Sequence, residues 1–94
     1  MYATIRSYSG STDLVDALLD HQNDIRQLIN GIGGFRAYYL VRTGGGNALT
    51  ISVFDDEGGA EESTRLAAGW IRDNLSDLSV TPPQVTSGEV ALSF

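Results

Sequence analysis

The chain has 94 residues, twelve of them acidic and six basic, and it contains no cysteine. A net charge of −6 disfavours nucleic acid and anionic membranes as partners, because both attract cationic proteins. The missing cysteine excludes disulfides and thiolate chemistry. A single domain of this length buries little more than about 60% of its unfolded surface, so we expect association with another subunit to supplement the core.

The N-terminal segment reads as a strand. Residues Tyr2 to Tyr8 are rich in aromatic and β-branched side chains, and turn formers follow at Ser9-Gly10-Ser11. No basic leader and no small-residue cleavage site precede this strand. We therefore expect a cytoplasmic protein.

The next segment has helical periodicity. Apolar residues recur at three- and four-residue spacing from Leu14 to Ile29, and Ser11 or Thr12 can supply the N-cap oxygen. The pattern predicts one helix from Thr12 to about Asn30, which the following glycines close.

Two more β-prone runs follow, Phe35–Arg42 and Ala48–Phe54. The glycines between them, Gly44 to Gly46, lack the lysine and the following helix of a phosphate-binding loop. They are typical of a tight turn, so the two runs are predicted to form a hairpin.

The last third predicts a second helix and a fourth strand. The helix begins after Asp55-Asp56, whose acids complement the positive helix end, and its apolar arc includes Trp70. Pro82-Pro83 forbids helix, and Val85–Phe94 is predicted to be the last strand.

This order of elements predicts one α+β domain over residues 1–94. The succession βαββαβ is typical of a ferredoxin-like sandwich, in which both helices cover one face of a four-stranded antiparallel sheet. The opposite face of a monomer should alternate with charged residues. Neither face of the segment 48–54 carries a charge, so we expect a second copy to cover the other face by two-fold symmetry.

These segments resemble the small dimeric α/β-barrel proteins of the antibiotic biosynthesis monooxygenase type and their uncharacterised bacterial relatives. The resemblance extends over nearly the whole chain and is carried by four segments, Tyr2–Arg6, Gly34–Tyr39, Ser52–Asp56 and Leu66–Trp70. It implies a homodimer whose sheets close into a barrel, with a pocket between helices and sheet in each subunit.

The resemblance also bears on activity. Characterised members of this group include cofactor-free oxygenases of polyaromatic substrates and haem-degrading oxygenases, and Trp70 resembles the pocket tryptophan of the oxygenases. The haem-degrading members use a strand-one asparagine and a histidine after the tryptophan. This chain has Ser7 or its neighbours on strand one and only His21, which precedes Trp70, so the resemblance implies no haem and no other cofactor.

Polar residues interrupt the apolar arc of the second helix. Asn74 follows Trp70 by one turn, and Ser63 precedes it by two turns. Two interpretations stay open. The three side chains line a pocket, or Trp70 is a core residue and Asn74 caps the helix end.

The first helix offers two polar candidates. Gln22 falls inside its apolar arc, where a buried amide needs hydrogen-bond partners, so we count it as a pocket candidate. His21 is predicted to be a boundary residue, because one histidine cannot build a metal site. The aspartates along this helix are predicted to form a solvated face and not a cation site. They are Asp13, Asp16, Asp20 and Asp24.

Arg6 is the electrostatic outlier, because it lies on a strand that is predicted to be covered on both faces. A buried guanidinium needs a partner, and Glu89 on the last strand is the predicted one. The alternative is that Arg6 anchors a substrate. Tyr8 and Tyr38 offer phenolic hydrogen bonds to a ligand, or they pack at the dimer interface.

Two functions follow from this sequence. The first is a homodimeric barrel protein with a pocket for a hydrophobic or aromatic metabolite and a cofactor-independent monooxygenase activity. The second is a binding or accessory module that turns over no substrate. A pocket on which Trp70, Asn74 and a tyrosine converge would favour the first function.

Overall fold

The computed structural model describes residues 1–10 and 13–94. The strands are β1 (Tyr2–Tyr8), β2 (Phe35–Gly44), β3 (Asn47–Phe54) and β4 (Gln84–Glu89), and the helices are α1 (Leu14–Asp20), α2 (Gln22–Asn30), α3 (Glu57–Asn74) and the short 3₁₀ helix η1 (Ser76–Leu78). The predicted N-cap at Ser11 or Thr12 lies outside the described residues.

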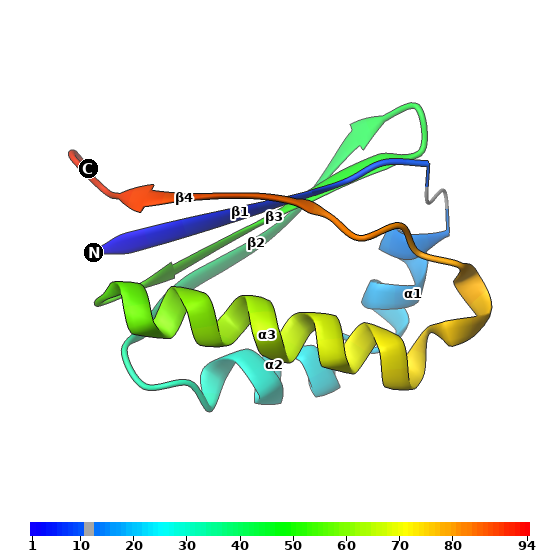
Figure 1. The fold of residues 1–94 in the computed structure, drawn as a ribbon, viewed down its shortest axis with the longest axis horizontal. Coiled ribbons are helices and arrows are strands. Elements are labelled where there is room, and N and C mark those ends of the chain that lie inside the picture. Colours follow the sequence, from blue (N-terminus) through cyan, green and yellow to red (C-terminus); the bar gives the residue numbers. More distant parts are fainter. Residues whose placement is uncertain (11–12) are drawn as a thin grey trace.

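The four strands form one antiparallel sheet in the order β2-β3-β1-β4. Figure 1 shows α2 and α3 side by side beneath the same face of this sheet. The order and the one-sided helical layer confirm the predicted ferredoxin-like α+β fold. The β2–β3 hairpin turns at Gly45 and Gly46, whose φ angles of 62° and 78° suit a tight hairpin turn.

The predicted first helix is two helices, which meet at His21. The His21 backbone has φ −109° and ψ 24°, and its N–H bonds to the carbonyls of both Ala17 and Leu18. That tightened turn ends α1. Between Leu19 and Ile25 the chain carries no apolar side chain to hold a continuous helix on the sheet. The prediction of one helix was therefore wrong at this point.

Strand β4 is shorter than predicted and ends at Glu89. Its partner β1 begins at Tyr2, which is opposite Glu89, so the residues beyond have no strand to pair with. One further bond joins the Val90 N–H to the Met1 carbonyl at 2.9 Å. The remaining residues extend past the sheet and expose Leu92 and Phe94 (Figure 1).

The two faces of the sheet follow from strand register. The helix-facing set on β1 and β3 is Tyr2, which is partly buried, and seven buried residues, Thr4, Arg6, Tyr8, Ala48, Thr50, Ser52 and Phe54. A bulge between Phe35 and Ala37 turns Phe35 toward the helices, where its ring contacts Phe54 with centroids 5.8 Å apart. Strict alternation along the predicted strand would put Phe35 and Ala37 on one face, and the bulge separates them.

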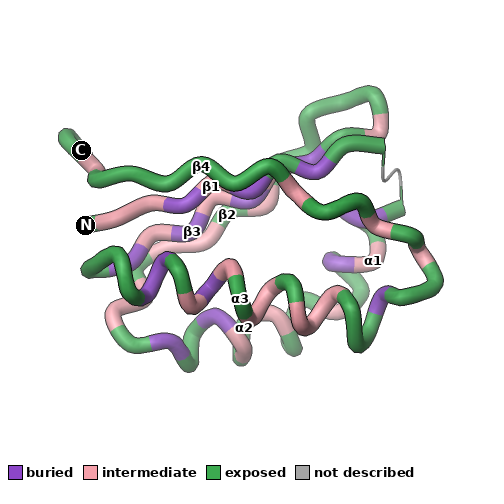
Figure 2. Tube along the Cα trace, viewed as in Figure 1, coloured by how far each residue is buried: buried purple, intermediate pink, exposed green. Residues whose placement is uncertain are grey.

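The other face of the sheet has no helical cover. Its rows are Ala37-Val53-Ala3-Gly88, Tyr39-Ile51-Ile5-Thr86 and Val41-Leu49-Ser7-Gln84, and none of these residues is charged. Tyr39 exposes 58% of its surface, and Figure 2 shows no fully buried residue along β4. We call these twelve residues the open face.

The core between sheet and helices has two parts. One gathers around Tyr8, Leu14, Leu18 and Leu75, and the other around Ile29, Ile32, Phe54 and Ala60. Helix α3 comes close to β3 at the second part, because Gly59 has no Cβ and an added one would lie 2.9 Å from Phe54 Cβ. The Asp56 side chain accepts a bond from the Gly59 N–H and caps the helix there. Between the two parts the buried residues of β1 and β3 are polar.

Candidate ligand-binding site

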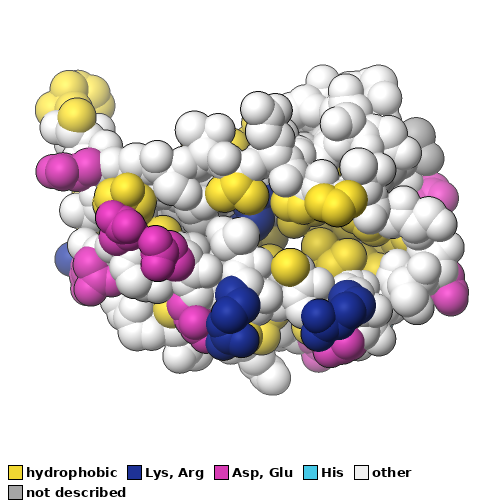
Figure 3. All heavy atoms as spheres, viewed as in Figure 1, with side chains coloured by type: hydrophobic (Ala, Val, Ile, Leu, Met, Phe, Trp, Pro, Cys, Tyr) yellow, Lys and Arg dark blue, Asp and Glu magenta, His cyan; other side chains and the backbone are white. Residues whose placement is uncertain are grey.

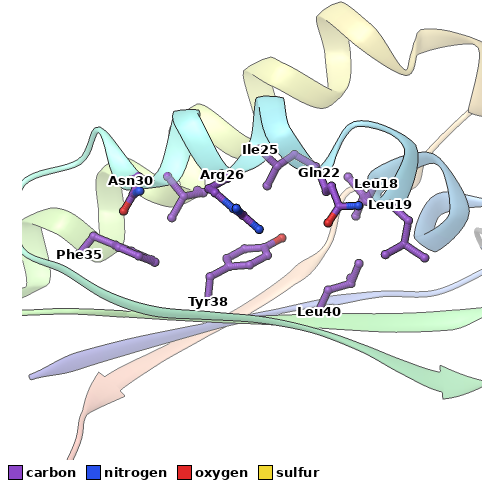
Figure 4. A pocket seen from close by; sticks show the side chains of 10 residues that line it. Leu18, Leu19, Gln22, Ile25, Arg26, Asn30, Phe35, Tyr38 and Leu40 are labelled. Carbon is purple, nitrogen blue, oxygen red and sulfur yellow. The ribbon is translucent and has the colours of Figure 1, made fainter.

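A pocket of about 400 Å³ opens between the helices α1 and α2 and strand β2. Figure 4 shows β2 as its floor and the two helices as its roof. Most of its wall is aliphatic or aromatic. The lining residues are Leu18, Leu19, Gln22, Ile25, Arg26, Ile29, Asn30, Phe35, Tyr38 and Leu40. We call it the β2-edge pocket.

Three polar side chains of α2 border this pocket. Gln22, Arg26 and Asn30 stand four residues apart and therefore share one side of the helix. Figure 4 shows Gln22 and Arg26 pointing from α2 toward β2. Arg26 makes no hydrogen bond and no ion pair with any residue that the structure describes. The pocket thus carries an unpaired cation at an apolar wall.

Arg6 lies in the interior, between the sheet and α3. Only 1% of its surface is exposed. Its Nη1 donates to Ser63 Oγ and Thr64 Oγ1, both at 3.1 Å, and its Nη2 donates to Ser52 Oγ at 3.0 Å. All three partners are neutral hydroxyls, so the positive charge is solvated by dipoles and not by a counter-ion.

The predicted ion pair between Arg6 and Glu89 does not form. In the β1–β4 register Arg6 is opposite Val85, whereas Glu89 is opposite Tyr2. Four residues of strand separate the two positions, which is roughly 13 Å. Among the described residues no carboxylate makes a salt bridge with Arg6.

Two tyrosines flank this buried cation. Burial raises the pKa of Tyr8, and the positive charge of Arg6 partly offsets that shift. Burial likewise raises the pKa of Tyr38, with Arg6 lowering it and Tyr8 raising it. Both phenols therefore stay protonated at neutral pH and can donate hydrogen bonds. Tyr38 also lines the β2-edge pocket.

Trp70 is placed behind this cluster. With Arg6, Tyr8 and Tyr38 it borders a small interior space of about 20 Å³, which is too small for an organic ligand. The His21 ring meets Trp70 edge-on, with centroids 5.4 Å apart. Trp70 therefore does not line the β2-edge pocket but contacts the interior space behind its Tyr38 wall.

Asn74 and Ser63 differ from the other candidates. Asn74 is exposed, and its Nδ2 donates to the Trp70 carbonyl at 2.9 Å near the end of α3. Ser63 is buried, accepts from Arg6 and donates to the Ala60 carbonyl at 2.7 Å.

Trp70, Asn74 and a tyrosine do not converge on one pocket. Of the predicted residues, Gln22 and Tyr38 lie at the β2-edge pocket and Arg6 and Tyr8 lie behind it.

Several pocket residues were missed at the sequence level. Arg26 and Asn30 extend the series that Gln22 begins, and that four-residue spacing was a usable signal. Alternation alone does not place Phe35 at the pocket, because a bulge cannot be read from the sequence pattern.

The aspartates of the first helical segment are exposed, as predicted. Asp16 pairs with Arg42 at 3.3 Å, and Asp24 lies 3.5 Å from His21. Within residues 1–10 and 13–94 no three side chains are grouped as a metal site requires. Among the same residues, no helix combines the length and the hydropathy that crossing a bilayer needs.

Solved structures share this fold. A candidate antibiotic biosynthesis monooxygenase from Deinococcus radiodurans matches with a TM-score of 0.69 and 20% identity, over 100% of this chain and 96% of that one. A dimeric ferredoxin-like protein from an uncultured marine organism matches with a TM-score of 0.70 and 10% identity, over 99% and 95%. The ActVA-Orf6 monooxygenase of Streptomyces coelicolor in complex with nanaomycin D matches with a TM-score of 0.70 and 13% identity, over 99% and 89%.

These similarities confirm the predicted resemblance at the level of the fold. No protein-family model matches the sequence, and no curated protein matches it. The chain therefore has the fold of the antibiotic biosynthesis monooxygenases and of dimeric ferredoxin-like proteins, at sequence identities that carry no activity from one protein to another.

Proposed function

We propose that this protein is a homodimer that binds a hydrophobic or aromatic metabolite in the β2-edge pocket. The observation that carries the proposal is the pocket itself, about 400 Å³ of mainly apolar space between helices and sheet. That volume falls within the range of about 300 to 1,000 Å³ that small-molecule sites occupy. The rings of Phe35 and Tyr38 on its floor favour a flat aromatic ligand.

Dimerisation is supported by the open face. Twelve uncharged residues, with Tyr39, Ile51 and Ile5 in the central row, form a surface that a second sheet can cover. A two-fold axis brings this surface against itself, which closes the interface and leaves no free copy of it.

For the chemistry we propose a cofactor-independent monooxygenation of a phenolic substrate to a quinone. Dioxygen supplies the new carbonyl oxygen, and its second atom leaves as water with the ring hydrogen and the phenolic hydrogen. A phenolate transfers an electron to dioxygen more readily than a phenol does, and a cation stabilises a phenolate. Arg26 at the pocket wall supplies such a cation.

The second candidate, a binding module without turnover, is favoured by a different observation. None of the residues lining the β2-edge pocket is a carboxylate or a histidine. Tyr38, the phenol at the pocket, has a raised pKa and holds its proton at neutral pH. No lining side chain is therefore an evident general base for a bound phenol.

Titration calorimetry with 1-naphthol tests the binding site. Leu40→Trp places an indole in the pocket and should weaken binding by about tenfold or more, the loss that a substantial steric conflict produces. Thr43→Trp, on the exposed end of the same strand, is the matched control and should bind like wild type. Equal affinities of both variants, or no binding by wild type, would overturn the assignment.

An oxygen electrode separates the two candidate functions. The monooxygenase predicts one dioxygen consumed for each naphthoquinone formed from 1-naphthol, with no added metal or flavin. Binding without oxygen uptake above the protein-free rate would instead identify the non-catalytic module.

A further inference from the structure

We propose a second binding site, for a monocarboxylate with an apolar body, at the opposite edge of the helix–sheet layer. A groove of about 420 Å³ lies between β4, the second half of α3 and the segment after it. Figure 3 shows hydrophobic side chains gathered in this hollow with a basic group at its floor. We call it the β4-edge groove, and it goes beyond the proposed function.

Arg6 lies at the floor of this groove. A guanidinium has five N–H donors, and three of those of Arg6 are used on Ser52, Ser63 and Thr64. The Nε donor is buried and has no partner among the described residues. A buried cation with an unused donor and no counter-ion attracts an anion more strongly than an exposed one, because water screens it less.

Arg72 adds a second positive charge to the wall of the groove. It is largely exposed, and its Nε lies 3.2 Å from Asp73 Oδ1. An exposed pair of this kind is weak, so the guanidinium is free to turn toward a ligand. The chain as a whole carries a charge of −6, which makes this pair of arginines a local exception.

The remaining wall selects the rest of the ligand. Ile71, Leu75, Val80, Pro83 and Val85 provide an apolar surface next to the two arginines. One charged end and one apolar body therefore suit the groove. A planar carboxylate matches the guanidinium fork better than a spherical anion does.

The β4-edge groove is distinct from the β2-edge pocket, because the two have no lining residue in common. The small interior space shares Arg6 and Tyr8 with the groove and Tyr38 with the pocket. If no ligand binds at one of the two cavities, binding at the other can therefore still be tested.

Titration calorimetry with octanoate and its neutral isostere octanamide tests the proposal. Wild type should bind octanoate at least about tenfold more tightly than octanamide, the difference that one charge-assisted hydrogen bond makes. Arg6→Met should remove this preference. Val85→Trp, which fills the groove from β4, should weaken both ligands.

Two α3 arginines give a matched pair of variants. Arg72→Gln should weaken octanoate binding severalfold and reduce its dependence on salt, because this charge is exposed. Arg65→Gln makes the same change in net charge away from the groove and should bind like wild type. Leu40→Trp, in the other pocket, should also leave octanoate binding unchanged.

The proposal fails if octanoate and octanamide bind wild type equally, or if Arg65→Gln weakens octanoate as much as Arg72→Gln does. Loss of octanoate binding in Leu40→Trp would place the anion in the β2-edge pocket instead. Should Arg6→Met not fold, Val85→Trp and Arg72→Gln decide the question on their own.

Discussion

The two faces of the sheet reverse the usual relation between polarity and burial. The helix-covered face buries Thr4, Arg6, Thr50 and Ser52, whereas the open face presents an uncharged and largely apolar surface to solvent. Buried polar groups cost free energy unless they are hydrogen-bonded, and exposed apolar patches mark interaction surfaces. This contrast underlies both proposals, a ligand site beneath the covered face and a second subunit on the open face.

The largest expected effect comes from a charge at the centre of the open face. Ile51→Lys places two ammonium groups near the two-fold axis of the proposed dimer, where both lose water and repel each other. The variant should elute as a monomer of about 10.1 kDa. The control Asn23→Lys, exposed on α2, should keep the wild-type mass, and a dimeric Ile51→Lys would contradict the proposed interface.

A core substitution measures how much the covered face relies on its few apolar positions. Phe54 is fully buried between β3 and α3, and its Cβ would be 2.9 Å from a Cβ added at Gly59. Phe54→Ala should lower the free energy of unfolding by about 3 to 5 kcal/mol in urea denaturation. Val53→Ala, one residue along on the open face, should cost clearly less, and an equal loss would mean that the two faces are packed alike.

Replacing the buried cation should have a smaller effect. Arg6→Met removes a charge that has no counter-ion among the described residues, but it also removes the donor that Ser52, Ser63 and Thr64 accept from. Because these two contributions oppose each other, the free energy of unfolding should change by less than about 2 kcal/mol. A loss of several kcal/mol would make Arg6 a structural residue and not a ligand anchor.

The smallest effect is a pH dependence of stability on the covered face. Burial raises the pKa of Tyr8 and Tyr38 above the ordinary 10.0, so above that pH the unfolded chain loses these protons first. Their contribution to stability is complete below pH 10.0 and is lost as the pH rises through their folded pKa values. Urea midpoints measured above pH 9 should fall more gently for the double variant Tyr8→Phe/Tyr38→Phe. An unchanged slope would contradict this origin.

Periodicity was enough to predict the order of elements and most strand bounds, because each strand and helix has its own apolar repeat. It could not locate the break at His21 or the bulge at Phe35, which depend on local backbone geometry. The partner of Arg6 depends on the β1–β4 register, so naming Glu89 from adjacency alone was wrong.

The candidate site was less predictable than the fold. Gln22 was predicted to be a buried amide, but it is exposed and borders the β2-edge pocket. Tyr38, predicted for its phenolic hydroxyl, lines the same pocket. Asn74 donates to the carbonyl of Trp70 in its own helix. The four-residue spacing of the two residues is compatible with this bond, so the spacing alone could not assign Asn74 to a pocket. Which polar residues face a common space depends on how α2 and α3 are placed over the sheet, and no local pattern contains that.

The molar mass of the wild-type protein, measured by light scattering across a micromolar concentration series, tests the central claim most directly. The difference between the two faces predicts twice the chain mass of 10.1 kDa throughout the series. A constant mass of 10.1 kDa would contradict it, because the open face would then remain in water.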